Sequence, residues 1–135
     1  MIQVTCALII NEGKVLVTQN HKESDHPLQW EFPGGKLKPN ESDQDCIIRE
    51  IKEELELDIL VLEKLVKVEH DYGIKKIELI PFVCKIVGGK LKLNNHVDKK
   101  WVSVSDMENI NFLGADKRLF TLTKNLVLLE KYSGE

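Results

Sequence analysis

The N-terminal part of the chain places short apolar runs between polar turns, a pattern typical of β-strands. Residues 2–10 and 14–19 are apolar and rich in β-branched side chains, and Asn11-Glu12-Gly13 separates them. Two such runs joined by a short glycine-containing connection predict a β-hairpin. Residues 20–30 are polar and predict a loop. The following Phe32-Pro33-Gly34-Gly35 predicts a tight turn or a close approach of the backbone to another group.

A helix is predicted from about Ser42 to about Leu55. Ser42, with Asp45 three residues later, matches the acid-terminated form of a helix-capping box. Ile48, Ile51 and Leu55 recur at helical spacing and are expected to face the core. The opposite arc of this helix is acidic.

The next apolar runs predict a second hairpin. Residues 59–70 and 74–87 are rich in Val, Ile and Leu, and the turn sequence Asp71-Tyr72-Gly73 lies between them. Gly88-Gly89 interrupts the pattern, and shorter strands are predicted at 90–93 and 101–104.

The C-terminal region predicts helices. Ser105 with Glu108 resembles a second capping box, which predicts a short helix. A terminal amphipathic helix is predicted from leucines at steps of three and four: Leu119, Leu122, Leu126 and Leu129. Hairpins, a central helix and a terminal helix together predict one α/β or α+β domain over residues 1–135, with helices packed on a mixed sheet.

The composition fits this fold class and narrows the function. The chain has 135 residues, 42% hydrophobic and 30% charged, with a net charge of −3. These values are typical of an ordinary soluble domain and argue against a nucleic-acid polymer as partner. No apolar run reaches the ~20 residues of a membrane span, and the first residues do not resemble a signal peptide. Three cysteines without a C-x-x-C pair favour free thiols in the cytoplasm.

The negative charge is concentrated in one segment. Residues 41–58 hold eight of the 22 acidic side chains and two of the 19 basic ones, so the remainder holds 14 acidic and 17 basic. Within this segment Glu50, Glu53 and Glu54 share one arc of the predicted helix. A solvated surface is one interpretation. However, like charges at this spacing cost about 0.2–0.5 kcal/mol per pair, and converging carboxylates suit a hard cation such as Mg²⁺.

The residues from Gly35 to Leu57 resemble the Nudix box, G-x5-E-x7-R-E-U-x-E-E-x-G-U, where U is aliphatic. The match comprises Gly35, Glu41, Arg49-Glu50, Glu53-Glu54 and both aliphatic positions, with Glu56 in place of the last glycine. Trp30-Glu31-Phe32-Pro33-Gly34-Gly35-Lys36 also resembles the lead-in of the MutT-like, or CTP pyrophosphohydrolase-like, branch. The resemblance implies the Nudix α/β/α sandwich around a central mixed sheet.

The same resemblance implies a set of catalytic and metal-binding residues. It implies Mg²⁺, with Mn²⁺ as a substitute, held by the Gly34 carbonyl and by Glu50, Glu53 and Glu54. Glu50 or Glu53 would take the proton of the attacking water, and this choice stays open. Arg49 would orient these carboxylates, since a guanidinium can bind a carboxylate through two donors. Glu41 would support the metal site or reach the metal through water. Lys36 would contact phosphate, or else is a solvated lysine.

Base recognition is implied for residues outside the box. Asp116 lies where relatives carry Asn or Asp that bind the edge of the base; the alternative is an ordinary acid in the first turn of a helix. Tyr72 and Phe82 are candidates for stacking on the base, although core packing would equally explain Phe82. The four histidines (His21, His26, His70 and His96) show no ligand spacing and are expected to be loop or surface residues.

Two positions depart from the family pattern. Asn20 follows Gln19 where many relatives have a phosphate-binding Arg, and Lys22 is a candidate replacement. Asn95 lies six residues before Trp101, where relatives often carry a metal-binding Glu. Phosphate affinity and the number of metal ions are therefore left open.

The resulting hypothesis is a Mg²⁺-dependent pyrophosphohydrolase that converts a nucleoside triphosphate to the monophosphate and pyrophosphate. Oxidised or otherwise modified nucleotides and pyrimidine triphosphates such as CTP are candidate substrates. One alternative is hydrolysis of a nucleotide sugar or a dinucleoside polyphosphate. Another is a non-catalytic domain that senses nucleotides. The protein is expected to be a monomer or a homodimer.

Overall fold

The computed structural model describes residues 1–134, and its N-terminal hairpin is the predicted one. Strand β1 (Ile2–Asn11) pairs antiparallel with β2 (Lys14–Gln19). The two turn residues, Glu12 and Gly13, have positive φ angles of 51° and 78°. Such angles at both central positions fit the right-handed twist of a two-residue hairpin.

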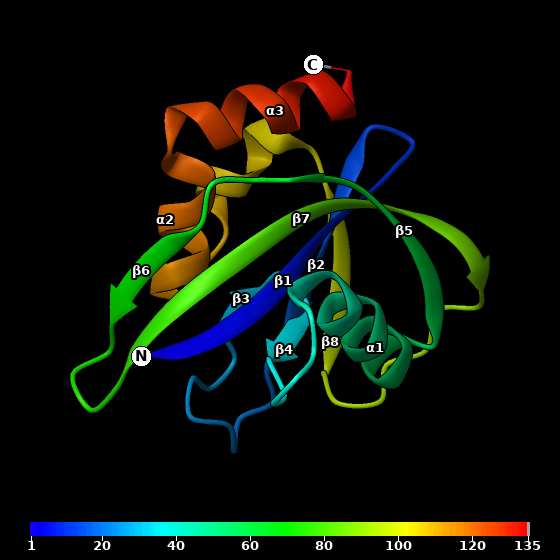
Figure 1. Ribbon diagram of the computed structural model, residues 1–135. Coiled ribbons are helices and arrows are strands. Elements are labelled where there is room, and N and C mark those ends of the chain that lie inside the picture. The colour runs from blue at the N-terminus through cyan, green and yellow to red at the C-terminus, as the bar shows by residue number, and fades with distance from the viewer. Residues whose placement is uncertain (135) are drawn as a thin grey trace.

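A mixed sheet is built around this hairpin (Figure 1). The main strand order is β3-β2-β1-β7-β5, with β4 beside β1, β6 beside β7 and β8 beside β2. The β1–β7 pair is parallel and the other pairs are antiparallel. The remaining strands are β3 (Trp30–Glu31), β4 (Gly34–Lys36), β5 (Leu57–Lys64), β6 (Val68–Asp71), β7 (Lys76–Gly89) and β8 (Asp98–Val102).

Helices cover both faces of the sheet (Figure 1). Helix α1 (Asp43–Leu55) packs over a core that includes Ile9, Leu16 and Ile51. On the other face, α2 (Gly114–Thr121), α3 (Thr123–Ser133) and the 3-10 helix η1 (Val104–Asn109) enclose a second core. This arrangement confirms the predicted mixed sheet with helices packed on it. Among residues 1–134, no helix combines the length and the apolar character needed to cross a membrane.

Three predictions about the second half of the chain were wrong in detail. Residues 90–93 form no strand, because the amides of Lys92 and Asn94 donate to the carbonyls of Leu55 and Glu54 at the end of α1. The short helix η1 is capped by Ser103, whose side chain accepts from Asp106, and not by Ser105.

The terminal helix is divided in two at Leu122. The buried Asn125 amide donates to the Leu119 carbonyl, and the Thr121 hydroxyl lies within hydrogen-bond distance of the carbonyls of Lys117 and Arg118. These side chains satisfy carbonyls that a continuous helix would have bonded internally.

Candidate active site

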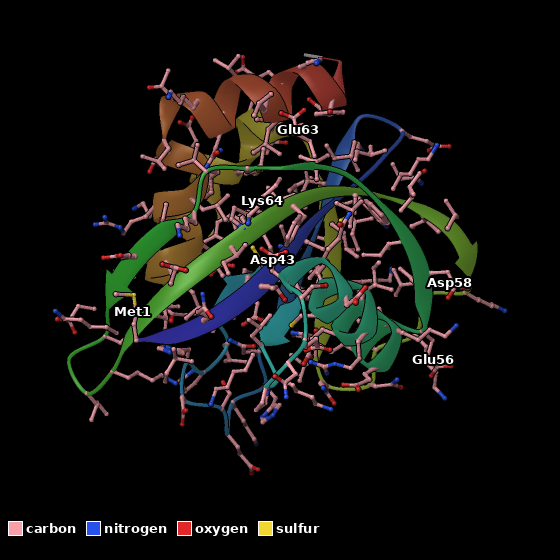
Figure 2. The ribbon with its side chains drawn as sticks, in the orientation of Figure 1. Met1, Asp43, Glu56, Asp58, Glu63 and Lys64 are labelled. Carbon is pink, nitrogen blue, oxygen red and sulfur yellow. The ribbon has the colours of Figure 1, made fainter. Side chains whose placement is uncertain are left out.

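Helix α1 is fixed at both ends, which positions the acidic arc. Ser42 caps its start by accepting from the Asp45 amide at 3.1 Å, as predicted. Asp43 forms a 2.6 Å ion pair with Lys64 of β5, and both are labelled in Figure 2. At the other end Glu56, also labelled there, adopts the left-handed conformation with φ 56° and donates its amide to the Lys52 carbonyl.

The core-facing side of α1 differs from the prediction at one position. Ile51 and Leu55 are fully buried, but Ile48 is 40% exposed. Cys46, Ile47 and Glu54 complete the buried side of the helix. The buried arc therefore includes a carboxylate, Glu54, which ordinary core packing does not explain.

Arg49 connects three carboxylates, which we call the Arg49 cluster: Glu41, Glu50 and Glu53. Its Nε and Nη2 donate to the two oxygens of Glu41 at 2.6 and 2.9 Å, a bidentate pair. Its Nη1 donates to Glu50 at 2.9 Å and to Glu53 at 3.2 Å. Nη2 also donates to the Lys36 carbonyl at 3.3 Å, which ties β4 to the helix. Arg49 therefore contacts two of the three carboxylates expected of it, Glu50 and Glu53, while its two-donor contact goes to Glu41 and no hydrogen bond to Glu54 is present among the described residues.

The electrostatics of Glu41 follow from this contact. The hydrogen bond from Arg49 lowers the pKa of Glu41 to about 2, and the Lys38 amide acts in the same direction. The Arg49 guanidinium has its own pKa raised by the same carboxylates. Glu41 is therefore ionised over the whole physiological range.

Glu54 is in the opposite situation. It is 9% exposed, and its Oε1 accepts a hydrogen bond from the Gly34 amide at 3.1 Å. Burial, followed by the negative charges of Glu31 and Glu50, raises the pKa of Glu54 to about 9. In the described part of the chain no lysine or arginine forms an ion pair with Glu54.

The two glycines of β4 allow the carboxylates to approach the sheet. A Cβ atom on Gly34 would collide with the Thr5 carbonyl of β1. A Cβ atom on Gly35 would collide with the carboxylate of Glu50. Neither glycine has a positive φ angle, so close approach rather than backbone conformation requires them.

The residues present fit a hard divalent cation. Glu50 offers carboxylate oxygens beside Gly35, and Glu54 offers them beside Gly34. Glu54 is a buried carboxylate close to other carboxylates and without a lysine or arginine partner among the described residues. A divalent ion would relieve this repulsion. Within residues 1–134, however, no three His, Cys, Asp or Glu side chains are already gathered closely enough to enclose an ion. Glu53 is 54% exposed and held by Arg49.

A cavity of about 200 Å³ lies beside these carboxylates. Its walls are largely apolar and include Phe32, Leu79 and Leu113. Its polar and charged lining comes from β1, β3, β4, the loop before β3, the β6–β7 turn and α2: Thr5, His26, Glu31, Lys36, Tyr72, Lys75 and Asp116. The cavity reaches Gly34 and Gly35 and therefore adjoins the carboxylates of α1.

Asp116 and Tyr72 lie together in this cavity. Asp116 is 5% exposed, and its Oδ2 accepts from the Phe32 amide at 2.8 Å. Burial and then the charge of Glu31 raise the pKa of Asp116 well above its usual range. The Tyr72 hydroxyl accepts from the Ala115 amide at 3.0 Å.

Phe82 does not reach the cavity. It is 2% exposed and belongs to the core beneath α1, on the face of the sheet that packs against that helix. The prediction that Phe82 stacks on the base is therefore wrong, and core packing accounts for it. The alternation of side chains along β7 directs this ring away from the cavity.

The structure also resolves the two departures from the family pattern. The Asn20 side chain donates to the His26 carbonyl and so helps to hold the loop. Lys22 lines a separate hollow with His21, Leu28 and Val97, not the cavity beside α1. Asn95 is exposed and does not line the cavity.

The cavity residues that were not among the predicted site residues include Glu31, His26 and Lys75. Glu31 lies within the Trp30–Lys36 motif, which could have indicated it. Nothing in the local sequence distinguishes His26 or Lys75 from ordinary loop residues.

A family match and two related proteins indicate the same family for this chain. The family described as NUDIX domain matches residues 1–123. A CTP pyrophosphohydrolase of Escherichia coli (strain K12) is 33% identical over 103 residues, which cover 76% of each chain. An 8-oxo-dGTP diphosphatase of Buchnera aphidicola subsp. Schizaphis graminum is 31% identical over 109 residues, covering 81% of this chain and 82% of that protein.

Solved structures share the fold. The solution structure of the E. coli ORF135 protein superposes with a TM-score of 0.80 at 30% identity, covering 95% of this chain and 90% of that one. The MutT protein from Methanosarcina mazei Go1 superposes with a TM-score of 0.81 at 23% identity, covering 99% and 96% of the two chains. Together with the family match, these likenesses show that the chain belongs to the NUDIX domain family.

Proposed function

We propose that this protein is a Mg²⁺-dependent pyrophosphohydrolase that hydrolyses a nucleoside triphosphate to the monophosphate and pyrophosphate. The observation that carries the proposal is Glu54, a buried carboxylate without a lysine or arginine partner among the described residues, which accepts from the amide of Gly34. Gly34 in turn lines the cavity that Asp116 also lines. The relatives named CTP pyrophosphohydrolase and 8-oxo-dGTP diphosphatase support the reaction class. CTP and oxidised dGTP are therefore the first substrates to test.

The proposed metal ligands are the carboxylates of Glu50, Glu53 and Glu54 with the Gly34 carbonyl, and Glu41 supports them through Arg49. When bound, Mg²⁺ supplies charge screening and polarises the phosphoryl oxygens, and it makes the attacking water more acidic. Mn²⁺ offers the same chemistry and is expected to substitute.

The protein's own groups position the reactants. Arg49 holds one oxygen of Glu50 and one of Glu53 at 2.9 and 3.2 Å, and the second oxygen of each is the proposed metal ligand. One of these two carboxylates takes the proton of the attacking water. Lys36 lines the cavity next to Gly35 and is the proposed phosphate contact.

The nucleoside end of the substrate is assigned to the other end of the cavity. There the buried Asp116 offers a carboxyl group to the edge of the base, and Tyr72 offers a ring face. A monomer or a homodimer in the cytoplasm is part of the same proposal. The three cysteines are free and buried, which suits a reducing compartment.

A substrate panel tests the proposal. NTPs, modified dNTPs, nucleotide sugars and dinucleoside polyphosphates are incubated with Mg²⁺ or Mn²⁺, and monophosphate plus pyrophosphate is measured separately from inorganic phosphate. We expect triphosphates to give monophosphate and pyrophosphate. If a nucleotide sugar or a dinucleoside polyphosphate is hydrolysed faster than any triphosphate, that class of compound replaces nucleoside triphosphates as the proposed substrate. Binding without turnover of any compound would indicate a sensor and would contradict the enzymatic proposal.

A further inference from the structure

The segment between β7 and β8 brings a buried histidine to the site. Residues 90–97 have no regular structure, but the segment is anchored at several points. The Asn94 amide and side chain donate to the carbonyls of Glu54 and Glu53 at 3.0 and 2.8 Å. The Val97 amide donates to the Gln19 carbonyl at 3.0 Å. These bonds fix the position of His96, which lies between the two anchors.

The His96 side chain is buried, and only one of its two ring nitrogens has a hydrogen-bond partner among the described residues. Its side chain is 4% exposed, and its Nε2 lies 3.4 Å from Oε2 of Glu31. Its Nδ1 is buried and has no hydrogen-bond partner among the described residues. A buried polar atom without a partner is costly, so packing alone does not explain a histidine at this position.

Glu31 needs a group that holds it in place. It lines the cavity between the carboxylates of α1 and Asp116, and its charge acts on both Glu54 and Asp116. In residues 1–134 no lysine or arginine pairs with Glu31. Repulsion from the neighbouring carboxylates would therefore turn Glu31 towards solvent, unless a donor opposes it.

We propose that His96 is a positioning residue that donates its Nε2–H to Glu31 and holds this carboxylate in the substrate cavity. The inference rests on the proposed function and deepens it, because it explains how Glu31, a carboxylate of the proposed substrate cavity, is held in place by His96. Asn95 cannot supply this contact, since its side chain is exposed. In this proposal the 90–97 segment acts on Glu31 through His96.

The first test does not depend on turnover. Long-range ¹H–¹⁵N NMR spectra of the nucleotide-free protein report which ring nitrogen of His96 carries a proton. We expect a protonated Nε2, and we expect the His96 ring resonances to shift in Glu31→Ala while those of the exposed His21 stay in place. An Nε2 without a proton, or no shift in Glu31→Ala, would overturn the contact.

The second test is a double-mutant cycle on kcat/KM for the best substrate of the panel. We expect His96→Leu to lower kcat/KM about tenfold, the scale of one lost hydrogen bond to a charged group. In a Glu31→Ala background, which removes the acceptor, the same substitution should have no further effect, because the residues act as one unit. His96→Gln, which keeps an N–H donor, should restore most of the activity. His21→Leu is the matched control and should match the wild type.

An equal loss from His96→Leu in both backgrounds would contradict the proposal, and so would unchanged activity in the single variant. If His96→Leu does not fold, His96→Asn replaces it in the cycle, since the shorter amide cannot reach Glu31. If the wild type hydrolyses none of the panel, the proposed function fails, and the NMR measurement still decides the His96–Glu31 contact.

Discussion

Two sets of carboxylates meet at this site, and the protein neutralises only one of them. The Arg49 cluster is held by a guanidinium at distances between 2.6 and 3.2 Å. The second set, which we call the cavity set, comprises Glu31 and Asp116 of the cavity lining and Glu54, which accepts from the amide of the lining residue Gly34. These three carboxylates have no lysine or arginine partner in the part of the chain described here.

The pKa values show the consequence of this difference. The pKa of Glu41 in the Arg49 cluster falls to about 2, whereas that of Glu54 rises to about 9. The first set is therefore organised by folding itself. In the second set, burial makes the charged forms of Glu54 and Asp116 costly in the folded protein, and a proton or a cation removes that cost.

The largest effect is expected when a carboxylate of the Arg49 cluster that is also a proposed metal ligand is removed. We expect Glu53→Gln to lower kcat by about 10²–10⁴-fold, the range for lost acid–base catalysis. Circular dichroism should show an unchanged fold. Glu56→Gln, three residues along the same helix, is the control and should keep near-normal turnover. Near-normal turnover of Glu53→Gln itself would remove Glu53 from the site.

Removing the Arg49 guanidinium should leave the first set, like the second, without a positively charged partner. Arg49→Met leaves Glu41, Glu50 and Glu53 without their donor, and we expect a loss of about 1–3 kcal/mol in the free energy of unfolding. Arg49→Lys should recover only part of it, because an ammonium cannot form the two-donor contact with Glu41. Urea unfolding measures both, and Arg118→Met is the control. Equal stability of all variants would show that Arg49 does not organise the cluster.

Within the cavity set, a substitution at Asp116 should change the recognition of the base without lowering the stability of the fold. Asp116→Asn keeps an oxygen that accepts from the Phe32 amide and removes a buried acid, so the fold should not lose stability. The ranking of kcat/KM among CTP, UTP, ATP and GTP should change by about tenfold, since one hydrogen bond to the base is altered. An unchanged ranking would make Asp116 a structural residue of α2.

The smallest effect is expected at the end of α1, outside both sets. Glu56 has a positive φ angle of 56°, a conformation that costs a non-glycine residue about 1 kcal/mol. Glu56→Gly, which restores the residue of the family pattern, should raise the free energy of unfolding by up to this amount and leave kcat unchanged. A destabilised variant would mean that the side chain contributes more than its backbone conformation costs.

The parts of the molecule that the sequence predicted well depend on neighbours along the chain. The hairpin at residues 11–13, the Ser42 cap and the contacts of Arg49 with Glu50 and Glu53 involve residues that are close in sequence. It was harder to predict which side chains of a strand face the core under α1 and which face the cavity. Phe82 and Leu79 have similar local surroundings in the sequence but face opposite sides of the sheet.

Contacts across the fold could not be predicted at all. Asp116 reaches the Phe32 amide over 84 positions, and His96 reaches Glu31 over 65. These pairs depend on how the 90–97 segment and α2 return to the sheet. The protonation of Glu54 also depends on that packing, since burial is its largest cause.

The central claim is that Glu54 is a buried acid whose charge no lysine or arginine of residues 1–134 offsets and a bound cation would stabilise. Its folded pKa of about 9 lies above the ordinary 4.5, so ionisation costs stability as pH rises between these values, and the cost is absent below about 4.5. The most direct measurement is the thermal unfolding midpoint of the wild type and Glu54→Gln at pH 5 and pH 9, with EDTA or with Mg²⁺.

With EDTA, the account predicts that Glu54→Gln is more stable than the wild type at pH 9 and that this advantage shrinks at pH 5. Mg²⁺ should raise the midpoint of the wild type at pH 9 and have little effect on Glu54→Gln. An equal Mg²⁺ effect on both proteins, or no advantage of Glu54→Gln at pH 9, would contradict it.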